Sequence, residues 1–593
     1  MKLPIFRGEK RYRRHMVTFG GLNLMQSFSD GEMRDCSGIS HISFPALTQR
    51  QKSASLFPCE KPSALIFAGK ECIAASGALY YDRTKVGELS EGTDKQLAYM
   101  GSKVLVFPDK VYYDVKEKKF GSLQAECVIS GVEVSFTQNA ITVPSANYVT
   151  TSKVEQHTFS QNELLTTYTS VTQQSGKFTF SGFKFKKPGE LLVDTILCEK
   201  CAANQYRTVM SIEESADLKS YTVTSKLITL ENSMKNIFSE FRANDVVEIS
   251  GCRTNANNKT ATIEQRGLAT LTFAEGTFSE TKETADITIK RKIPDFTSVC
   301  SYENRLWGCE GNTIYASALG DPFNFFRYRQ LSTDSFSVES STSGDFTACV
   351  TYGNCCLFFK ENACYKLYGN RPANFQLTES FGSGLAKTER RSIASVNGKI
   401  LYNGNGGVFV FYGGIPQCVS QKIEGITLKD TIGGSDGKRY YLSTQTESGR
   451  IELVYDTELG LWSKSGVKDV VAYEYYGGTM YRLTSEGVEE ILAEPDENAQ
   501  WSVTLCPFDE NYYKTKNYSR IHICAQLFND SWICVEVKSD NGQWRTVSTQ
   551  YGNEKRYINI PVIIKSCHNM EIRLSGKGKS IIESITREFC VKG

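Results

Sequence analysis

The sequence predicts an all-β, multi-domain protein built around a β-propeller of six to eight blades, with an inserted β-region and a C-terminal β-sandwich. Three observations predict this fold class. A chain of 593 residues is too long for one hydrophobic core. Its 47 glycines, 30 tyrosines and 33 phenylalanines suit tight turns and half-buried pleated surfaces. Short alternating apolar runs separated by polar turns recur along most of the chain, which is typical of strands and hairpins.

A repeated unit indicates the propeller. Each unit has an apolar run, a polar turn and a second run that ends in aromatic residues, with two units before residue 115 and five after residue 297. Equivalent aromatic residues lie at Tyr315, Tyr365, Phe411 and Tyr455, at spacings of 50, 46 and 44 residues. That period is typical of a propeller blade, which buries its faces only against neighbouring blades. The alternative is an irregular protein of several sheets.

The domain boundaries follow from where this pattern begins and stops. We expect an N-terminal arm and strands closing the propeller over 1–62, the first blades over 63–125, inserted β-domains over 126–292, the remaining blades over 293–495 and the sandwich over 496–593. The second half of the insertion is interpreted as a small barrel or sandwich because its strands are short and its turns polar. Seven regularly spaced apolar runs predict the C-terminal sandwich.

Two segments of the insertion have distinct patterns. The best helical window of the chain runs from Leu227 to Phe241, where apolar residues recur at intervals of three and four. Residues 177–185 alternate strongly between Lys or Ser and Phe, which predicts a strand. No topology is predicted for residues 126–226.

Charge and hydropathy exclude several classes. The net charge of +2 provides no global attraction to nucleic acid. Residues 7–15 contain five basic side chains, among them Arg11, Arg13 and Arg14; we interpret them as a solvated arm, with contact to DNA or an acidic partner as the alternative. No apolar run is long enough for a signal peptide or a membrane anchor, so we expect synthesis and assembly in a cytoplasm.

The residues that could carry chemistry are scattered. The 19 cysteines are expected to be reduced and mostly buried, and Cys198 and Cys201 have the spacing of only half a zinc site. The five histidines stand singly. Residues 433–437 match the nucleophile-elbow pattern, but the strand-like run after them predicts a hairpin turn. We therefore expect no catalytic residues, no cofactor, no metal and no enzymatic activity.

A string of short motifs carries a resemblance to a known family. The motifs lie at 19–24, 30–33, 35–40, 44–47, 301–308, 317–325, 358–362 and 404–414. They resemble the nozzle, or DNA-stabilisation, proteins of short-tailed bacteriophages, over about half of the chain.

The resemblance implies a structural component of a virion, located in the tail and assembled in the cytoplasm of the host bacterium. It would be a nozzle subunit in a ring of six copies that extends the DNA channel and helps to retain and deliver the genome. The implied partners are further copies of the chain, the portal or adaptor, other tail proteins, and double-stranded DNA passing through the lumen without sequence specificity. The cysteine content and the long insertion depart from the family, which leaves attachment and tip contacts open.

Two other functions remain open at this point. One is a tail-tip or baseplate protein whose C-terminal sandwich recognises a host glycan by stacking on Trp501, Trp532 and Trp544. Filling the sandwich core is the alternative interpretation of at least two of these tryptophans. The other is a propeller hydrolase of cell-wall or capsular polysaccharide, which no sequence motif supports.

Overall fold

The chain is nearly all β, as predicted, and divides into two compact units. A first unit comprises residues 1–122 and 294–593, and a second unit comprises residues 123–293. The computed structural model describes residues 10–92, 94–144, 148–174, 177–232, 236–274, 276–467, 469–529, 531–552 and 554–591. Helix in this described part is limited to short 3-10 turns, at η1 (Pro188–Glu190), η2 (Asn255–Asn257), η3 (Pro372–Asn374), η4 (Lys387–Ser392) and η5 (Gln421–Ile423).

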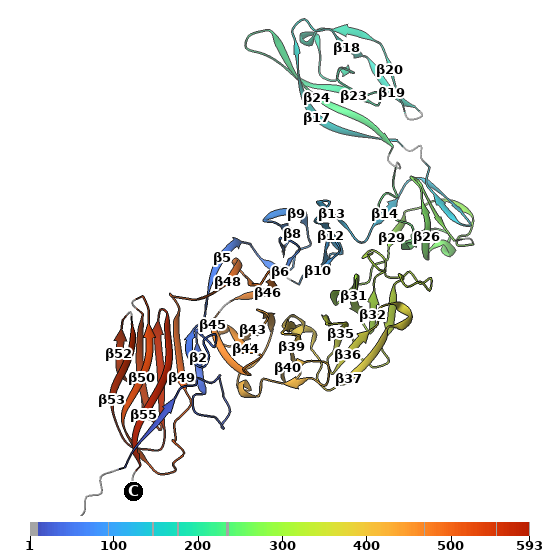
Figure 1. The fold of residues 1–593 in the computed structure, drawn as a ribbon. Coiled ribbons are helices and arrows are strands. Elements are labelled where there is room, and N and C mark those ends of the chain that lie inside the picture. Colours follow the sequence, from blue (N-terminus) through green and yellow to red (C-terminus); the bar gives the residue numbers. More distant parts are fainter. Residues whose placement is uncertain are drawn as a thin grey trace, which may run out of the picture. The chain divides into compact units, whose positions relative to one another are not determined.

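Seven four-stranded antiparallel sheets are formed by the described residues of the first unit (Figure 1). The first four sheets contain β6 (Pro62–Phe67), β7 (Glu71–Ala75), β8 (Ala78–Tyr81) and β9 (Thr84–Glu88); β10 (Gln96–Met100), β11 (Lys103–Phe107), β12 (Val111–Asp114) and β13 (Lys119–Ser122); β30 (Ser298–Tyr302), β31 (Arg305–Glu310), β32 (Thr313–Ala316) and β33 (Phe336–Glu339); β34 (Ala348–Tyr352), β35 (Cys355–Lys360), β36 (Ala363–Tyr368) and β37 (Gln376–Phe381). The other three contain β38 (Ala394–Val396), β39 (Lys399–Gly404), β40 (Gly407–Phe411) and β41 (Gln417–Cys418); β42 (Ile432–Ser435), β43 (Arg439–Thr446), β44 (Gly449–Asp456) and β45 (Leu461–Val467); β46 (Val470–Tyr476), β47 (Thr479–Thr484), β48 (Gly487–Pro495) and β5 (Gln51–Pro58).

Consecutive sheets pack against one another, mostly through their first strands. Such contacts join β6 to β10, β10 to β30, β30 to β34, β38 to β42 and β42 to β46, and β46 returns to β6. The sheets that begin with β34 and β38 share one hydrophobic core. The seventh sheet therefore packs on the first.

The aromatic period predicted from the sequence is confirmed. Tyr315, Tyr365, Phe411 and Tyr455 lie in β32, β36, β40 and β44, which is the third strand of each sheet. The predicted hairpin at residues 433–437 is confirmed too, because β42 and β43 pair across it.

Two further sheets complete the first unit as a sandwich. All seven strands predicted after residue 500 are present, and four strands from the N-terminus join them. Of these, β1, β2 and β4 pair with strands more than 450 positions away, and β3 pairs with β4. One sheet contains β1 (Arg11–Met16), β3 (Ile39–Ser40), β4 (Leu47–Gln49), β50 (Lys516–Leu527), β53 (Lys555–Cys567) and β55 (Ser580–Val591). The other contains β2 (Met33–Ser37), β49 (Gln500–Leu505), β51 (Trp532–Ser539), β52 (Arg545–Tyr551) and β54 (Met570–Lys577).

The sandwich and the seven sheets share a core. Trp462 of β45 and Tyr440 of β43 are buried in one cluster with Val503 of β49 and Ile572 of β54. Phe19 enters the same cluster from the N-terminal segment. Because apolar burial is continuous between the two parts, they are expected to unfold together.

The second unit contains two β-modules. An eight-stranded sheet has residues from both its halves in a single core, so it is bent over on itself. Its strands are β14 (Glu126–Ile129), β15 (Glu133–Thr137), β16 (Ala140–Thr142), β25 (Val246–Ser250), β26 (Thr260–Arg266), β27 (Thr270–Phe273), β28 (Thr281–Thr284) and β29 (Ile287–Arg291). The six-stranded module, residues 148–232, contains β17 (Tyr148–Ser160), β18 (Leu165–Tyr168), β21 (Lys184–Lys186), β22 (Ile196–Leu197), β23 (Gln205–Glu214) and β24 (Ser220–Asn232), with the hairpin β19 (Ser170–Gln174) and β20 (Lys177–Ser181).

The helix expected from Leu227 to Phe241 is wrong. Residues up to Asn232 belong to β24, residues 233–235 lie outside the described part, and residues 236–240 form turns. Strand β24 is hydrogen-bonded to β17 on one side and β23 on the other. Pairing on both edges satisfies its backbone groups, and this outweighs a local helical pattern.

Candidate functional site

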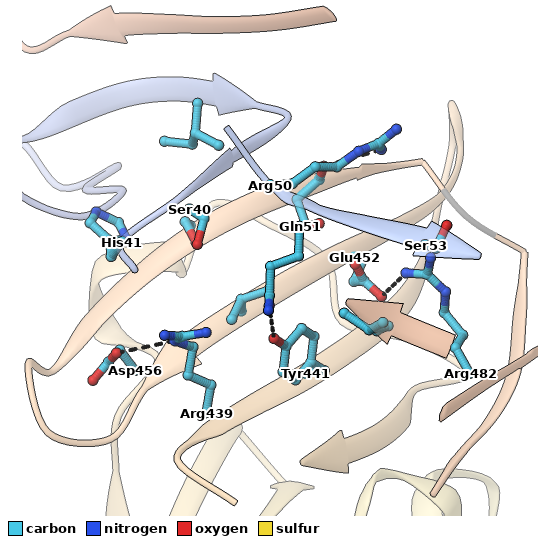
Figure 2. Close-up of a pocket in the computed structure, with 15 residues that line it drawn as sticks. Ser40, His41, Arg50, Gln51, Ser53, Arg439, Tyr441, Glu452, Asp456 and Arg482 are labelled. Carbon is cyan, nitrogen blue, oxygen red and sulfur yellow. Dashed lines mark hydrogen bonds and ion pairs between the residues drawn. The ribbon is translucent and has the colours of Figure 1, made fainter. Parts of the chain in front are cut away.

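A polar cavity lies where the N-terminal segment meets the sixth and seventh sheets (Figure 2). Strands β43, β44 and β45 line it from the sixth sheet, and β47, β48 and β5 from the seventh. The remaining lining comes from β3, His41 and Arg50. The side chains that line the cavity with polar groups are Ser40, His41, Arg50, Gln51, Ser53, Arg439, Tyr441, Glu452, Asp456, Ser463, Ser465 and Arg482.

A buried ion pair joins the two sheets at this cavity. The Arg482 Nη1 of β47 lies 2.9 Å from the Glu452 Oε1 of β44. The Arg482 Nη2 lies 2.7 Å from Glu489 of β48, and the Tyr473 hydroxyl donates to Glu452 Oε1 at 2.7 Å. Glu452 and Arg482 are both buried, so each charge depends on the other for compensation.

These partners set the ionisation of the pair. Burial raises the pKa of Glu452, but the guanidinium of Arg482 and the hydroxyl of Tyr473 outweigh it and hold that pKa below its ordinary value. Burial lowers the pKa of Arg482, and the carboxylates of Glu452 and Glu489 outweigh that effect and raise it. Both groups are therefore charged at neutral pH.

Two carboxylates lie beside Arg439, in a second group of charges at the cavity. The Arg439 Nη1 lies 3.2 Å from Asp436, and its Nε lies 3.4 Å from Asp456. The Tyr441 hydroxyl lies 3.1 Å from the Asp436 Oδ2 and 3.3 Å from the Gln51 Oε1, so these two oxygens share its one proton. Through Gln51, the sixth sheet is hydrogen-bonded to a strand that lies about 390 positions earlier in the chain.

Arg50 and His41 connect the N-terminal segment to its surroundings. The Arg50 Nη2 lies 3.5 Å from Asp496, and its Nη1 donates to the Ser465 carbonyl oxygen at 3.5 Å. The His41 Nε2 is 3.2 Å from the Gly20 carbonyl oxygen, to which it donates. Burial lowers the pKa of His41, so the ring is neutral at neutral pH.

The size of the cavity limits its chemistry. Its volume of about 30 Å³ accommodates water, whereas small-molecule sites usually measure roughly 300 Å³ or more. Its charged groups also compensate one another in pairs. The arrangement therefore acts as a fastening between the N-terminal segment and two sheets, and it has no room for a sugar.

One carboxyl of the seventh sheet has a different environment. Glu474 lies on β46, in register with Tyr481 of β47. Burial raises the pKa of Glu474 to about 7, in contrast to the paired Glu452. A carboxyl that titrates near neutral pH makes the stability of the seventh sheet sensitive to pH.

The predicted basic segment belongs to a sheet. Arg11, Arg13 and Arg14 lie on β1, which pairs with β55, and their side chains are exposed. The Arg13 Nε is 2.7 Å from Glu588 of β55. Arg7, which was counted in the same segment, lies outside the described residues.

The three predicted stacking residues do not form one platform. Trp501 is buried in the shared core, whereas Trp532 and Trp544 are half-buried. The guanidinium of Arg573 covers the Trp544 ring at 4.0 Å. Lys538, which also lies over Trp544, is six residues along β51 from Trp532, or roughly 20 Å.

Cys198 and Cys201, which have the spacing of half a zinc site, are half-buried, and burial raises the pKa of Cys198 to about 11. Within the described ranges, no group of three or more potential ligands is placed to hold a metal ion. None of the helices described has the length and apolar character needed to cross a membrane.

Sequence reasoning missed Glu452, Arg482 and Arg439. Each is an ordinary strand residue in the sequence, and the Glu452 partner of Arg482 and the Asp456 partner of Arg439 lie on other strands. A pattern confined to one segment contains no signal for such pairs. Asp436 lies three positions before Arg439, so a local charge pattern could have indicated that pair alone.

Comparison with known proteins identifies no family. No family model matches the sequence, and no curated protein is similar to it. Solved structures with partial similarity include an exo-β-1,3-galactanase from Phanerochaete chrysosporium, with 10% identity over 48% of this chain and 92% of that chain and a TM-score of 0.18. A family 43 arabinoxylan arabinofuranohydrolase from Bacillus subtilis matches with 9% identity over 49% and 78%, at a TM-score of 0.16. PorZ, a surface component of the type-IX secretion system of Porphyromonas gingivalis, matches with 10% identity over 92% and 80%, at 0.22.

These matches contradict one prediction. The chain was expected not to be an enzyme, but the galactanase and the arabinofuranohydrolase are glycoside hydrolases. We therefore withdraw that expectation. With TM-scores near 0.2, the matches assign no activity, substrate or site to this chain.

Proposed function

We propose that the chain is a structural subunit of a bacteriophage tail that forms a ring around the DNA channel, as a nozzle protein does. The observation that carries this proposal is the double fastening of the N-terminal segment. Strand β5 completes the seventh sheet, and β1 to β4 complete the sandwich. One continuous segment thus ties together the two largest parts of the first unit.

The finer fold assignment belongs to the same proposal. We infer that the seven four-stranded sheets are the blades of a seven-bladed propeller, within the range predicted from the sequence. The return contact of β46 to β6 supports closure of the ring. Because β5 enters the last blade from the opposite end of the chain, opening the ring requires breaking a full strand ladder.

A ring of sheets that is closed on itself and held by the N-terminal segment is suited to form a channel wall. A channel wall around packaged DNA is under outward pressure, so its weakest joint limits the pressure that the wall can withstand. The joint here combines the β5–β48 ladder, the Arg482–Glu452 pair and a hydrophobic core continuous with the sandwich. Removing one partner of a buried ion pair strongly destabilises the fold, because the other charge stays buried without compensation. This favours one fixed arrangement of the joint.

Two of the motifs that resemble nozzle proteins lie at hairpin turns, and another attaches the N-terminal segment to the sixth sheet. Residues 301–308 span the turn between β30 and β31, and residues 404–414 include the turn between β39 and β40. In the N-terminal motifs, the Leu22 amide donates to the Trp462 carbonyl oxygen at 2.7 Å, which attaches that segment to the sixth sheet.

Quantitative mass spectrometry of purified phage particles tests the assignment. We expect this chain to copurify with intact particles, at a fixed copy number relative to other tail proteins and close to six. Recovery of the chain only in the soluble lysate, with none in particles, would contradict the proposal.

A further inference from the structure

Four cysteines gather between the third and fourth sheets, which begin with β30 and β34. Cys309, Cys349 and Cys356 belong to one buried hydrophobic cluster, and Cys300 packs against it. The Cys300 sulfur is in hydrogen-bonding contact with the thiols of Cys349 and Cys356, and Cys349 makes the same kind of contact with Cys309. The four thiols therefore form one connected group between the two sheets.

Strand register explains why these thiols meet. In the third sheet, Cys309 pairs with the residue two positions before Cys300, so both cysteines lie on one face of that sheet. In the fourth sheet, Cys356 pairs with the residue two positions after Cys349, so these two also share a face. The opposite face of the fourth sheet belongs to another core, which contains Cys355. The two cysteine-bearing faces are therefore the ones that pack against each other.

The first strands of the two sheets approach closely at this point. The Cys349 amide donates to the Ser298 Oγ at 3.0 Å, and the Thr351 Oγ1 donates to the Ser301 carbonyl oxygen at 2.9 Å. These two hydrogen bonds lie on either side of Cys300 along β30. Cys349 is therefore the contacting thiol on the adjacent strand, whereas the other contacting thiol lies on β35, the next strand of the fourth sheet.

Cys300 differs from its neighbours in exposure and acidity. It is half-buried, whereas Cys309, Cys349 and Cys356 are buried. Hydrogen bonds from the Cys349 and Cys356 thiols lower the pKa of Cys300 below its ordinary value, against the effect of burial. Burial raises the pKa of Cys349 and of Cys356. A partly exposed thiol that is stabilised as a thiolate, beside a second thiol, is the arrangement that reacts with peroxides.

We propose that Cys300 is a peroxide-reactive cysteine and that Cys349 converts its oxidised form into a disulfide between the third and fourth sheets. The Cys300 thiolate attacks one oxygen of hydrogen peroxide, which gives a sulfenic acid and releases hydroxide. The Cys349 sulfur then attacks the Cys300 sulfur, the S–S bond forms, and the sulfenic oxygen leaves as water. Two thiols thus lose two electrons and two protons to one peroxide, which becomes two waters.

The bond depends on the redox state of the surroundings. A reducing cytoplasm keeps such thiols reduced, and an oxidising exterior allows the bond to form. The disulfide closes a loop of about 50 residues across two sheets, which constrains the unfolded chain and stabilises the first unit. The inference goes beyond the proposed tail role and does not depend on it.

Peptide mass spectrometry of the full chain tests the proposal. Reduced protein is treated with a small excess of hydrogen peroxide, the remaining thiols are alkylated, and the digest is compared before and after reduction. We expect a peptide pair that links Cys300 to Cys349, and we expect the midpoint of urea unfolding to rise on oxidation. Cys300 that stays fully alkylated, or a bridge from Cys300 to any other cysteine, would overturn the proposal.

Variants assign the two roles. Cys349→Ser should leave Cys300 as a sulfenic acid, and dimedone should label it at least about tenfold more than it labels wild type, because the second thiol is missing. Cys300→Ser should form no bridge at Cys349 and show no rise of the urea midpoint. Cys355→Ser, at a buried position on the opposite face of the fourth sheet, is the matched control and should form the bridge like wild type.

The outcome does not require every variant to fold. The peptide map of the wild-type chain needs no substitution, so it decides the proposal even where a serine variant is insoluble. Where Cys349→Ser is folded, dimedone labelling equal to that of wild type would overturn the assignment of Cys349.

Discussion

Two regions of the molecule treat charged and apolar side chains in opposite ways. One is the junction of the sixth and seventh sheets within the first unit, and the other is the six-stranded module of the second unit. Both are built from antiparallel strands. At the junction, charged groups are buried and paired, as Arg482 is with Glu452, within a core that continues into the sandwich. In the module, the hydrophobic cluster among described residues has six buried members, whereas eight large apolar side chains are exposed. These eight are Val154, Leu164, Phe183, Phe185, Leu192, Val193, Met210 and Leu218.

The difference indicates which region holds the fold together. The first unit completes its structure with its own N-terminal segment, through β1 to β5. The module keeps apolar area that no described part of its own core covers. We infer that the junction determines stability.

The largest effect is expected from deletions. Removal of residues 1–61 eliminates β1 to β5, opens the edge of β48 and takes Phe19 out of the shared core, so we expect an insoluble or noncooperatively unfolding product. Replacement of residues 124–292 by a short Gly-Ser linker should leave the first unit folded. The ends of the second unit lie close together, because the Arg291 amide donates to the Ala125 carbonyl oxygen at 2.8 Å.

Size-exclusion chromatography and thermal unfolding followed by circular dichroism distinguish these products. A soluble, cooperatively folded chain without residues 1–61 would show that the fastening is dispensable. Loss of folding after the internal replacement would show that the units depend on each other.

Breaking the buried ion pair should have the next largest effect. Arg482→Ala leaves Glu452 charged and buried, and should lower the free energy of unfolding by about 3–5 kcal/mol. Lys85→Ala is the control, because its pair with Glu88 is exposed and should be worth less than about 1 kcal/mol. Urea midpoints measure both; similar shifts for the two variants would contradict the role of the junction.

The tryptophans of the sandwich provide a contrast within one domain. Trp501→Ala removes a buried ring and should cost about 3–5 kcal/mol of unfolding free energy. Trp544→Ala removes a half-buried ring over which Arg573 and Lys538 lie, so about 1 kcal/mol is expected. Chemical denaturation compares them, and a larger loss for Trp544 would reverse the assignment of core and surface.

The smallest effect concerns pH. The folded state binds a proton at Glu474 more tightly than the unfolded state, because burial raises that pKa from 4.5 to about 7. Stability therefore falls as pH rises from 4.5 to 7 and then levels off. Glu474→Gln should be more stable than wild type by about 1–2 kcal/mol above pH 7, and by little near pH 4.5. Urea midpoints at the two pH values measure this, and a gain that is equal at both would exclude the titration.

The local part of the fold could be predicted from the sequence. Hairpins repeat with a period of 44 to 50 residues, and the aromatic residues that mark them, such as Tyr365 and Phe411, lie in equivalent strands. Seven strands of the sandwich were predicted for the same reason. Turn chemistry and alternation are properties of a few neighbouring residues, so a single sequence contains them.

The nonlocal part could not be predicted. The ladder between β5 and β48 joins positions more than 400 residues apart, and no pattern in either strand identifies its partner. The pair of Glu452 with Arg482 depends on the packing of adjacent sheets in the same way. At Leu227, pairing on both edges of β24 overrode a helical spacing. Residues 177–185 form two strands separated at Gly182, a residue with φ of 73°, so their alternation predicted strand but not this separation.

Electron cryomicroscopy of the intact phage particle tests the assignment of the chain to a ring around the DNA channel. We expect the first unit to fit a six-fold ring of tail density that is continuous with the DNA channel, with β1 to β5 in place at the joint. Density for the chain only at the periphery or tip of the tail, outside any ring around the channel, would contradict it.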